Sequence, residues 1–177
     1  DLNSGCDVNF VLTNLYSQFP TSVINRTALV LALAQAAEQE PFNFQVYGPE
    51  QVNVAPAHYH GGISYDKQRP LFASCRITIN THVNNGFGGR YANERDGILP
   101  ASSGLLLVDG ETPSVLTAGR DCLMMESTQP EQIAKQVVHI LRNYDQYRAI
   151  RWTGARTVHE LYTQTTFATA IHAQISK

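Results

Sequence analysis

Residues 105–109 have the sequence Leu105-Leu106-Leu107-Val108-Asp109, and this stretch decides the expected fold. Four consecutive apolar residues leave no polar face, so a strand formed here has to be covered on both sides. Parallel sheets with helices on both faces provide this covering. Asp109 ends the apolar run, and we expect it to lie at the carboxyl edge of the sheet, where α/β folds bind ligands.

Strand-like and helix-like segments alternate on either side of this stretch. Further strands are expected at 7–12, 42–47, 63–65, 76–80 and 122–125. Helices are expected from Thr21 or Ser22 to about Glu40 and at 66–74, 92–102, 112–118, from Pro130 onward, 146–156 and 158–175. The alternation predicts an α/β Rossmann-like three-layer sandwich. Its mainly parallel sheet has about six strands, with helices on both faces and further helices at the C-terminus.

Length and composition indicate one domain. The chain has 177 residues, 43% of them hydrophobic, which is enough for a single core. Only 16% are charged and the net charge is −2, so nucleic acid is not an expected partner. No apolar run approaches the roughly 20 residues of a transmembrane helix. The chain begins at Asp1 without a signal peptide, and we interpret it as cut from a longer protein at a domain boundary.

The cysteines indicate a reducing compartment. Cys6, Cys75 and Cys122 are odd in number, and their spacing fits no zinc site. We expect buried, reduced thiols in a cytoplasmic protein. His58, His60 and His82 have no acidic or cysteine partner nearby in sequence, so they are interpreted as polar loop residues and no metal site is predicted. Trp152 is expected to pack in the interior, and Arg151 to lie on a solvated helix face.

The loop after Asn80 is the richest in glycine, with the sequence Asn84-Asn85-Gly86-Phe87-Gly88-Gly89-Arg90. Glycines let backbone amides approach an anion, and the following helix start adds a favourable dipole. Arg90 and Arg95 could bind phosphate oxygens. Together these features predict a diphosphate site. The loop matches neither the Walker motif nor the dinucleotide-binding fingerprint.

The order of several short motifs resembles the C-terminal domain of GT-B fold glycosyltransferases. It is most similar to the group-1 branch that includes the spore-maturation protein CgeB, and the resemblance spans nearly the whole chain. The matching segments are Val46-Tyr47-Gly48, Gly62-Ile63-Ser64-Tyr65, Ile77–Asn80, Glu94-Arg95, Ser103-Gly104 with Leu105–Asp109, Arg151–Arg156 and His159–Thr163.

This resemblance implies a domain that binds the donor, a nucleoside diphosphate sugar for which UDP is the expected carrier. Catalysis would be metal-independent and need no cofactor, and the missing N-terminal domain would supply the catalytic residues, so this chain alone is expected to be inactive. The expected donor-binding residues are Thr13, Asn14, Arg26, Gly48, Ile63, Tyr65, Asn80, Gly88, Arg90, Glu94, Arg95, Asp96, Ser103 and Gly104.

One departure from the family leaves alternatives open. The family usually has an acidic residue, which holds the ribose, where this sequence has Leu99, and Pro100 resembles a one-residue insertion. Asp96 or Glu94 could substitute, or nucleotide binding could be weakened. A non-catalytic scaffold is therefore the main alternative function. A sugar-nucleotide epimerase is a further one, disfavoured by the missing dinucleotide fingerprint.

Overall fold

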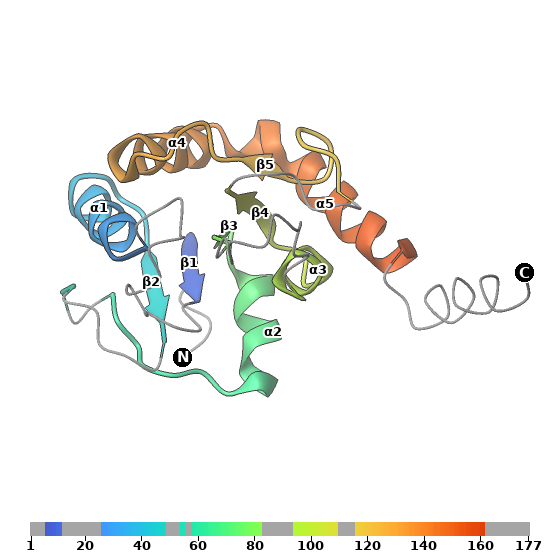
Figure 1. The fold of residues 1–177 in the computed structure, drawn as a ribbon, viewed down its shortest axis with the longest axis horizontal. Coiled ribbons are helices and arrows are strands. Elements are labelled where there is room, and N and C mark those ends of the chain that lie inside the picture. The colour runs from blue at the N-terminus through green and yellow to red at the C-terminus, as the bar shows by residue number, and fades with distance from the viewer. Residues whose placement is uncertain are drawn as a thin grey trace, which may run out of the picture.

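The computed structural model describes residues 6–11, 26–48, 54–55, 58–82, 94–109 and 116–161. Within them lies one sheet of five parallel strands in the order β2-β1-β3-β4-β5. The strands are β1 (Val8–Val11), β2 (Phe44–Tyr47), β3 (Ile77–Asn80), β4 (Leu105–Val108) and β5 (Leu123–Met124). Figure 1 shows their arrangement. The parallel sheet confirms the predicted fold class.

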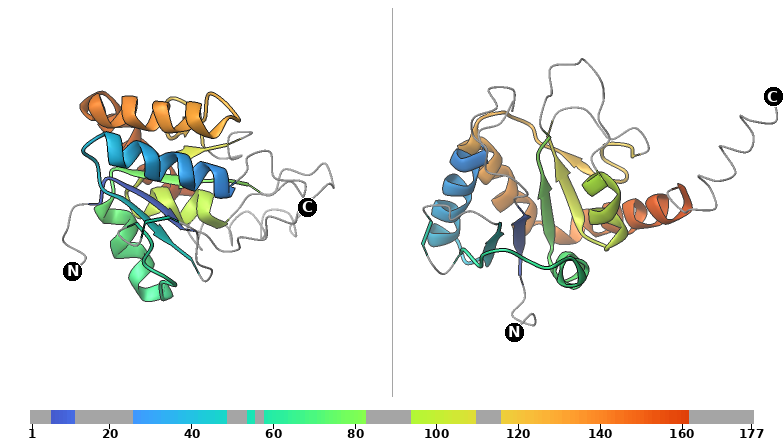
Figure 2. Two further views of the ribbon diagram at one scale, coloured as in Figure 1. Left: turned by 90° about the vertical axis from the view of Figure 1, so that its left-hand side faces the viewer. Right: turned by 60° about the horizontal axis from the view of Figure 1, so that its bottom comes forward.

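Helices cover both faces of the sheet, as predicted (Figure 2). One face carries α1 (Arg26–Gln39) and α4 (Pro130–Arg142). The other carries α2 (Tyr65–Ser74) and α3 (Glu94–Ala101). The helix α5 (Tyr144–Leu161) begins beside the first group and ends against the second. The molecule is therefore a three-layer α/β sandwich.

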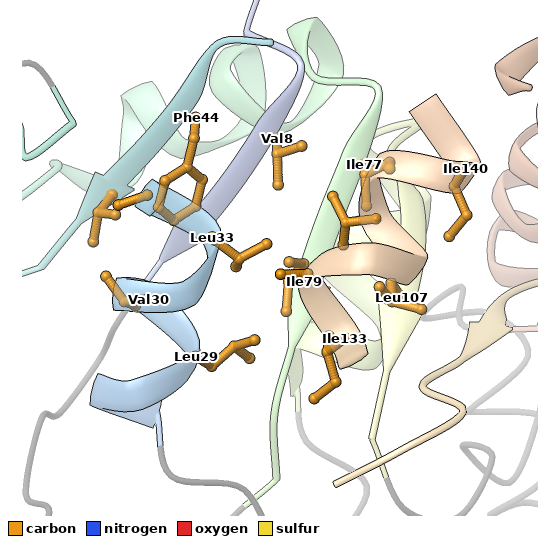
Figure 3. Close-up of a cluster of buried hydrophobic side chains, with 14 of the residues drawn as sticks. Val8, Leu29, Val30, Leu33, Phe44, Ile77, Ile79, Leu107, Ile133 and Ile140 are labelled. Atoms are coloured by element: carbon orange, nitrogen blue, oxygen red, sulfur yellow. The ribbon is translucent and has the colours of Figure 1, made fainter. Parts of the chain in front are cut away.

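Alternate strand residues build two separate cores, because successive side chains of a strand point to opposite faces. Leu105 and Leu107 point toward α1 and α4, into the core drawn in Figure 3, whereas Leu106 and Val108 pack beneath α2 and α3. All four are fully buried. Burying a side chain of this size contributes about 1.5–3 kcal/mol. This result confirms the prediction that residues 105–108 are covered on both faces.

The amino edge of the sheet is fastened by polar contacts. Nε of Arg151 donates to the carbonyl oxygen of Ser103, and its Nη2 donates to that of Ala73 at 2.9 Å. One guanidinium thus satisfies carbonyl groups where α2 and α3 end, which would otherwise lack helical partners. Arg76 forms an ion pair with Asp7 at 3.2 Å, joining β3 to β1. The expectation that Arg151 lies on a solvated face was wrong, because its side chain spans two helix ends.

Four local predictions were also wrong. Residues 63–65 form no strand, and Tyr65 instead begins α2; the part of the chain that the structure describes has five strands, where about six were predicted. Residues 116–118 are not helical, since Ala118 forms a bridge with Cys122; residues 112–115 lie outside the described part. The C-terminal segment does not break at Thr157, whose hydroxyl donates to Asp121 at 2.9 Å from within a continuous α5. Trp152 is 59% exposed rather than packed inside.

Candidate functional site

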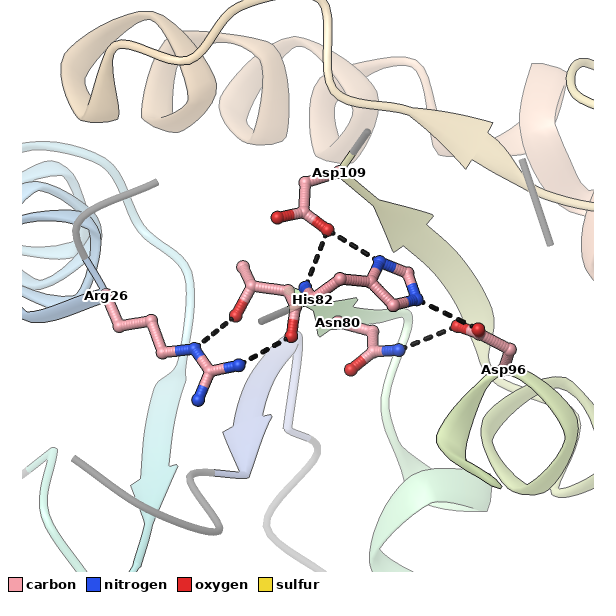
Figure 4. Close-up of polar contacts among 6 residues, drawn as sticks. Arg26, Asn80, His82, Asp96 and Asp109 are labelled. Atoms are coloured by element: carbon pink, nitrogen blue, oxygen red, sulfur yellow. Dashed lines mark hydrogen bonds and ion pairs between the residues drawn. The ribbon is translucent and has the colours of Figure 1, made fainter. Parts of the chain in front are cut away.

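The candidate site lies at the carboxyl edge of the sheet, which we call the rim. Because all five strands are parallel, the segments that follow them emerge at this one edge. Polar side chains from the ends of β3 and β4 and from the starts of two helices meet there (Figure 4). We call this group the rim cluster, and its members are Arg26, Asn80, Thr81, His82, Asp96 and Asp109.

His82 is the centre of the rim cluster. Its Nδ1 lies 2.8 Å from Oδ1 of Asp109, and its Nε2 lies 2.9 Å from Oδ2 of Asp96. The backbone amide of His82 also donates to Oδ1 of Asp109 at 2.8 Å. The histidine side chain is 24% exposed, whereas those of Asp96 and Asp109 are 2% and 4% exposed. Two nearly buried carboxylates therefore share one imidazole ring.

This arrangement fixes the charge of His82. Hydrogen bonds to Asp109 and then to Asp96 raise its pKa to about 10, against the opposing effect of burial. Both ring nitrogens donate a hydrogen bond when the ring is protonated. His82 is consequently a cation at neutral pH, and it compensates the two carboxylates, which would be costly to bury unpaired.

Arg26 brings a second cation to the rim. It is the first residue of α1, and its Nε donates to Oγ1 of Thr81 at 2.8 Å. Its Nη2 donates to the carbonyl oxygen of Thr81, also at 2.8 Å. Burial lowers the pKa of Arg26, and the charge of Asp109 opposes that shift. Arginine nevertheless stays charged in proteins, so the helix start presents a fixed positive group.

Asn80 and Asp96 connect β3 to α3. Nδ2 of Asn80 donates to Oδ1 of Asp96 at 2.7 Å, while the second oxygen of Asp96 faces His82. Asp96 is 1% exposed in total. Since both carboxylate oxygens already bind protein groups, Asp96 acts on the site through its neighbours. Arg95, the preceding residue of α3, is half-buried.

Gly48, Ile63 and Tyr65 lie along the segment from β2 to α2. The amide of Gly48 donates to the carbonyl oxygen of Gly61 at 2.9 Å, and its own carbonyl accepts from the hydroxyl of Tyr59 at 2.8 Å. The side chain of Ile63 packs against the second core. Tyr65 is 79% exposed at the first turn of α2. These bonds fix the start of the segment and leave Tyr65 accessible.

Ser103 and Gly104 are not brought to the rim. They follow the end of α3 and precede β4, which places them at the amino edge of the sheet. Ser103 has a φ of 62°, which closes α3. A Cβ on Gly104 would lie 2.6 Å from Oγ1 of Thr78, so this glycine lets α3 approach β3 closely. Thr13, Asn14, Gly88, Arg90 and the side chain of Glu94 lie outside the described residues.

The histidines have partners other than metal ligands. Nδ1 of His58 lies 2.9 Å from the carbonyl oxygen of Phe44, and the ring of His60 stacks on Tyr47. Within the described part of the chain, no group of three or more His, Cys, Asp or Glu residues could hold a metal ion.

Among the residues that the structure describes, no helix is both long and apolar enough to cross a membrane.

Sequence reasoning placed Asp109 at the carboxyl edge of the sheet but did not include it or His82 among the donor-binding residues. The available signal was their position directly after two strands that end at the same edge. What the sequence could not show is that β3 and β4 are neighbours, which brings the histidine within 2.8 Å of the aspartate.

Residues 26–173 match the family described as "Glycosyl transferase-like". The chain belongs to this glycosyl transferase-like family. The match includes the rim cluster and the five helices α1 to α5 of the described residues. A comparison with curated protein sequences found no match.

Solved structures share the fold of this glycosyl transferase-like chain. HepE of Anabaena in complex with UDP-glucose has a TM-score of 0.70 at 11% identity, covering 99% of this chain and 50% of HepE. The C-terminal domain of the group 1 glycosyl transferase LpcC from Francisella tularensis has a TM-score of 0.61 at 12% identity, covering 89% and 87%. Sucrose-phosphate synthase from Thermosynechococcus elongatus has a TM-score of 0.63 at 11% identity, covering 99% and 46%. The chain thus spans about half the length of HepE.

Proposed function

We propose that this chain is the donor-binding domain of a two-domain glycosyltransferase and forms its C-terminal half. The observation that carries the proposal is the rim cluster, which fixes the guanidinium of Arg26 at the edge where α/β domains bind ligands. Two similarities support it: the fold covers most of the isolated C-terminal domain of LpcC, and HepE, about twice as long, binds UDP-glucose.

The proposed ligand is a nucleoside diphosphate sugar, with UDP as its carrier. Arg26 and Arg95 lie at the starts of α1 and α3, where helix dipoles also favour an anion. The backbone beside Ile63 would hold the base, with exposed Tyr65 next to it. The resemblance to GT-B enzymes further assigns Thr13, Asn14 and Arg90 to the phosphates.

The proposed reaction transfers the sugar to an acceptor hydroxyl without a bound metal ion. Arginine side chains and backbone amides would stabilise the negative charge that develops on the leaving diphosphate. The general base and the acceptor site would belong to the N-terminal domain, so this chain alone binds the donor without turnover. We also propose that the protein belongs to the CgeB-like branch and acts in the cytoplasm, where Cys6, Cys75 and Cys122 would stay reduced.

A thermal-shift panel of UDP, GDP, ADP, CDP and NAD tests this proposal. A ligand at 100 times its dissociation constant stabilises a protein by about 2.7 kcal/mol. We expect stabilisation by UDP and none by NAD. Stabilisation by NAD alone would instead indicate a dinucleotide enzyme.

Replacing Arg95 tests the diphosphate site directly. Loss of a charge-assisted hydrogen bond costs about 1.5–3 kcal/mol, so Arg95→Ala should weaken UDP binding by roughly 10- to 150-fold in calorimetry. Arg148→Ala is the matched control, because Arg148 is an exposed arginine of α5 that pairs with the likewise exposed helix residue Asp145. Equal UDP affinity in both variants would contradict the proposed site.

A non-catalytic binding module is the second candidate function, and Leu99 favours it. Leu99 is 2% exposed and belongs to the second core, so no carboxylate is available at the position that the resemblance gives to the ribose. Asp96 is already bound by Asn80 and His82. If none of the five nucleotides stabilises the protein, this candidate replaces the first.

A further inference from the structure

His82 connects three segments at the rim through its two ring contacts. The residue itself follows β3, Asp109 follows β4, and Asp96 lies in the first turn of α3. Its ring contacts both aspartates, at 2.8 and 2.9 Å (Figure 4).

The geometry does not suit His82 to bind a ligand directly. Each ring nitrogen already faces a carboxylate oxygen, which leaves the ring no donor for a phosphate. Its effect must therefore pass through its partners. Asp96 directly follows Arg95 in α3, and Asn80 holds the other oxygen of Asp96 at 2.7 Å. Together the two contacts fix the first turn of α3 on the carboxyl ends of β3 and β4.

We propose that His82 is a positioning residue of the donor site: its bridge between Asp109 and Asp96 holds the first turn of α3, and with it Arg95, in the geometry that binds the diphosphate. This inference rests on the proposed function. Preorganisation of this kind raises affinity because binding no longer has to order the groups that contact the ligand.

His82 also has a structural role, because removing its positive charge leaves the buried carboxylates of Asp96 and Asp109 without that compensation. His82→Gln should therefore lower the melting temperature. Combining it with Asp96→Asn removes one of the two carboxylates and should restore much of that loss. The double variant lacks the ionic bridge, but the positive charge lost at position 82 is matched by the negative charge lost at position 96. Weaker UDP binding by this variant would therefore reflect lost positioning of Arg95 and not lost stability.

The experiment measures UDP affinity by calorimetry well below the melting temperature of each protein. We expect His82→Gln and His82→Gln/Asp96→Asn to bind UDP at least 10-fold more weakly than the unaltered chain, although the double variant recovers melting temperature. His139→Gln is the control, because His139 is an exposed histidine of α4. The dissociation constant of His139→Gln for UDP should stay within 2-fold of that of the unaltered chain.

The outcomes distinguish this inference from the proposed function. If the unaltered chain binds UDP and the thermally recovered double variant binds it within 2-fold, the positioning role is overturned while the donor site stands. If the unaltered chain binds no nucleoside diphosphate at all, the proposed function fails and this inference fails with it.

Discussion

At the scale of single residues, His82 makes the stability of the fold depend on pH. Its pKa is raised to about 10 in the folded chain, above the roughly 6.5 of an unfolded histidine. The stabilisation is therefore complete below pH 6.5 and declines between pH 6.5 and 10, by up to about 1.4 kcal/mol per pH unit. Above pH 10 it is lost.

Urea unfolding at pH 6, 8 and 10 measures this effect. The difference in unfolding free energy between the unaltered chain and His82→Gln should shrink as pH rises, because the variant has no imidazole to titrate. A difference that stays constant over this range would show that the folded histidine is not held protonated.

The residue types of the site could be predicted only in part. Arg26, Asn80 and Asp96 were among the donor-binding residues expected from the resemblance to GT-B enzymes, and the structure brings these three together. The role considered for Asp96, replacing the missing ribose acid, overlooked its burial. Burial of a carboxylate depends on partners from other elements, and no local pattern reveals those partners.

At the scale of elements, the packing of α5 depends on Gly154. A Cβ at this position would lie 2.1 Å from the carbonyl oxygen of Asp121, which is a backbone atom and cannot turn away. Gly154→Ala should destabilise the protein by about 1–3 kcal/mol, the usual cost of overpacking. Alanine is otherwise more favourable than glycine in a helix interior, so a loss of stability would be due to this contact.

The control for Gly154→Ala is Gly62→Ala, because a Cβ at Gly62 meets nothing within 4 Å. Both variants can be compared by their urea midpoints. If Gly154→Ala is as stable as the unaltered chain, then α5 can move away from Asp121. The close contact between Gly154 and the Asp121 backbone would then not be required for stability.

Elements were predictable where one local signal dominated. β3 and β4 were placed within one residue, because an uninterrupted apolar run allows few other interpretations. The break predicted before residue 158 failed for a tertiary reason: Thr157 gains a partner in Asp121, which lies 36 residues away in the sequence. Residues 63–65 were too few to show whether apolar residues repeat with the period of a strand or of a helix, and Tyr65 is the first residue of α2.

At the scale of the whole molecule, the second core should protect all three thiols, because each of them belongs to it. Cys6, Cys75 and Cys122 are buried, and burial raises the pKa of Cys122 to about 12. Because the thiolate is the reactive form, none should react with a thiol reagent such as DTNB while the protein is folded. All three should react in urea. Rapid labelling of the folded chain would contradict this packing.

The layered architecture was predictable from the sequence, whereas the order of the strands was not. Alternating segments predict a parallel sheet with helices on both faces, but several strand orders satisfy that rule. The order places β3 next to β4 and so creates the contact between His82 and Asp109. The site therefore depends on topology that only the three-dimensional structure supplies.

The fastening of the amino edge has a consequence for protein engineering. Arg151 and the ion pair between Asp7 and Arg76 secure helix ends and strands on the side away from the rim. Exposed positions such as Tyr65 could then be randomised in a library without touching these anchors. A selection for altered sugar-nucleotide preference should consequently retain a high proportion of well-folded clones.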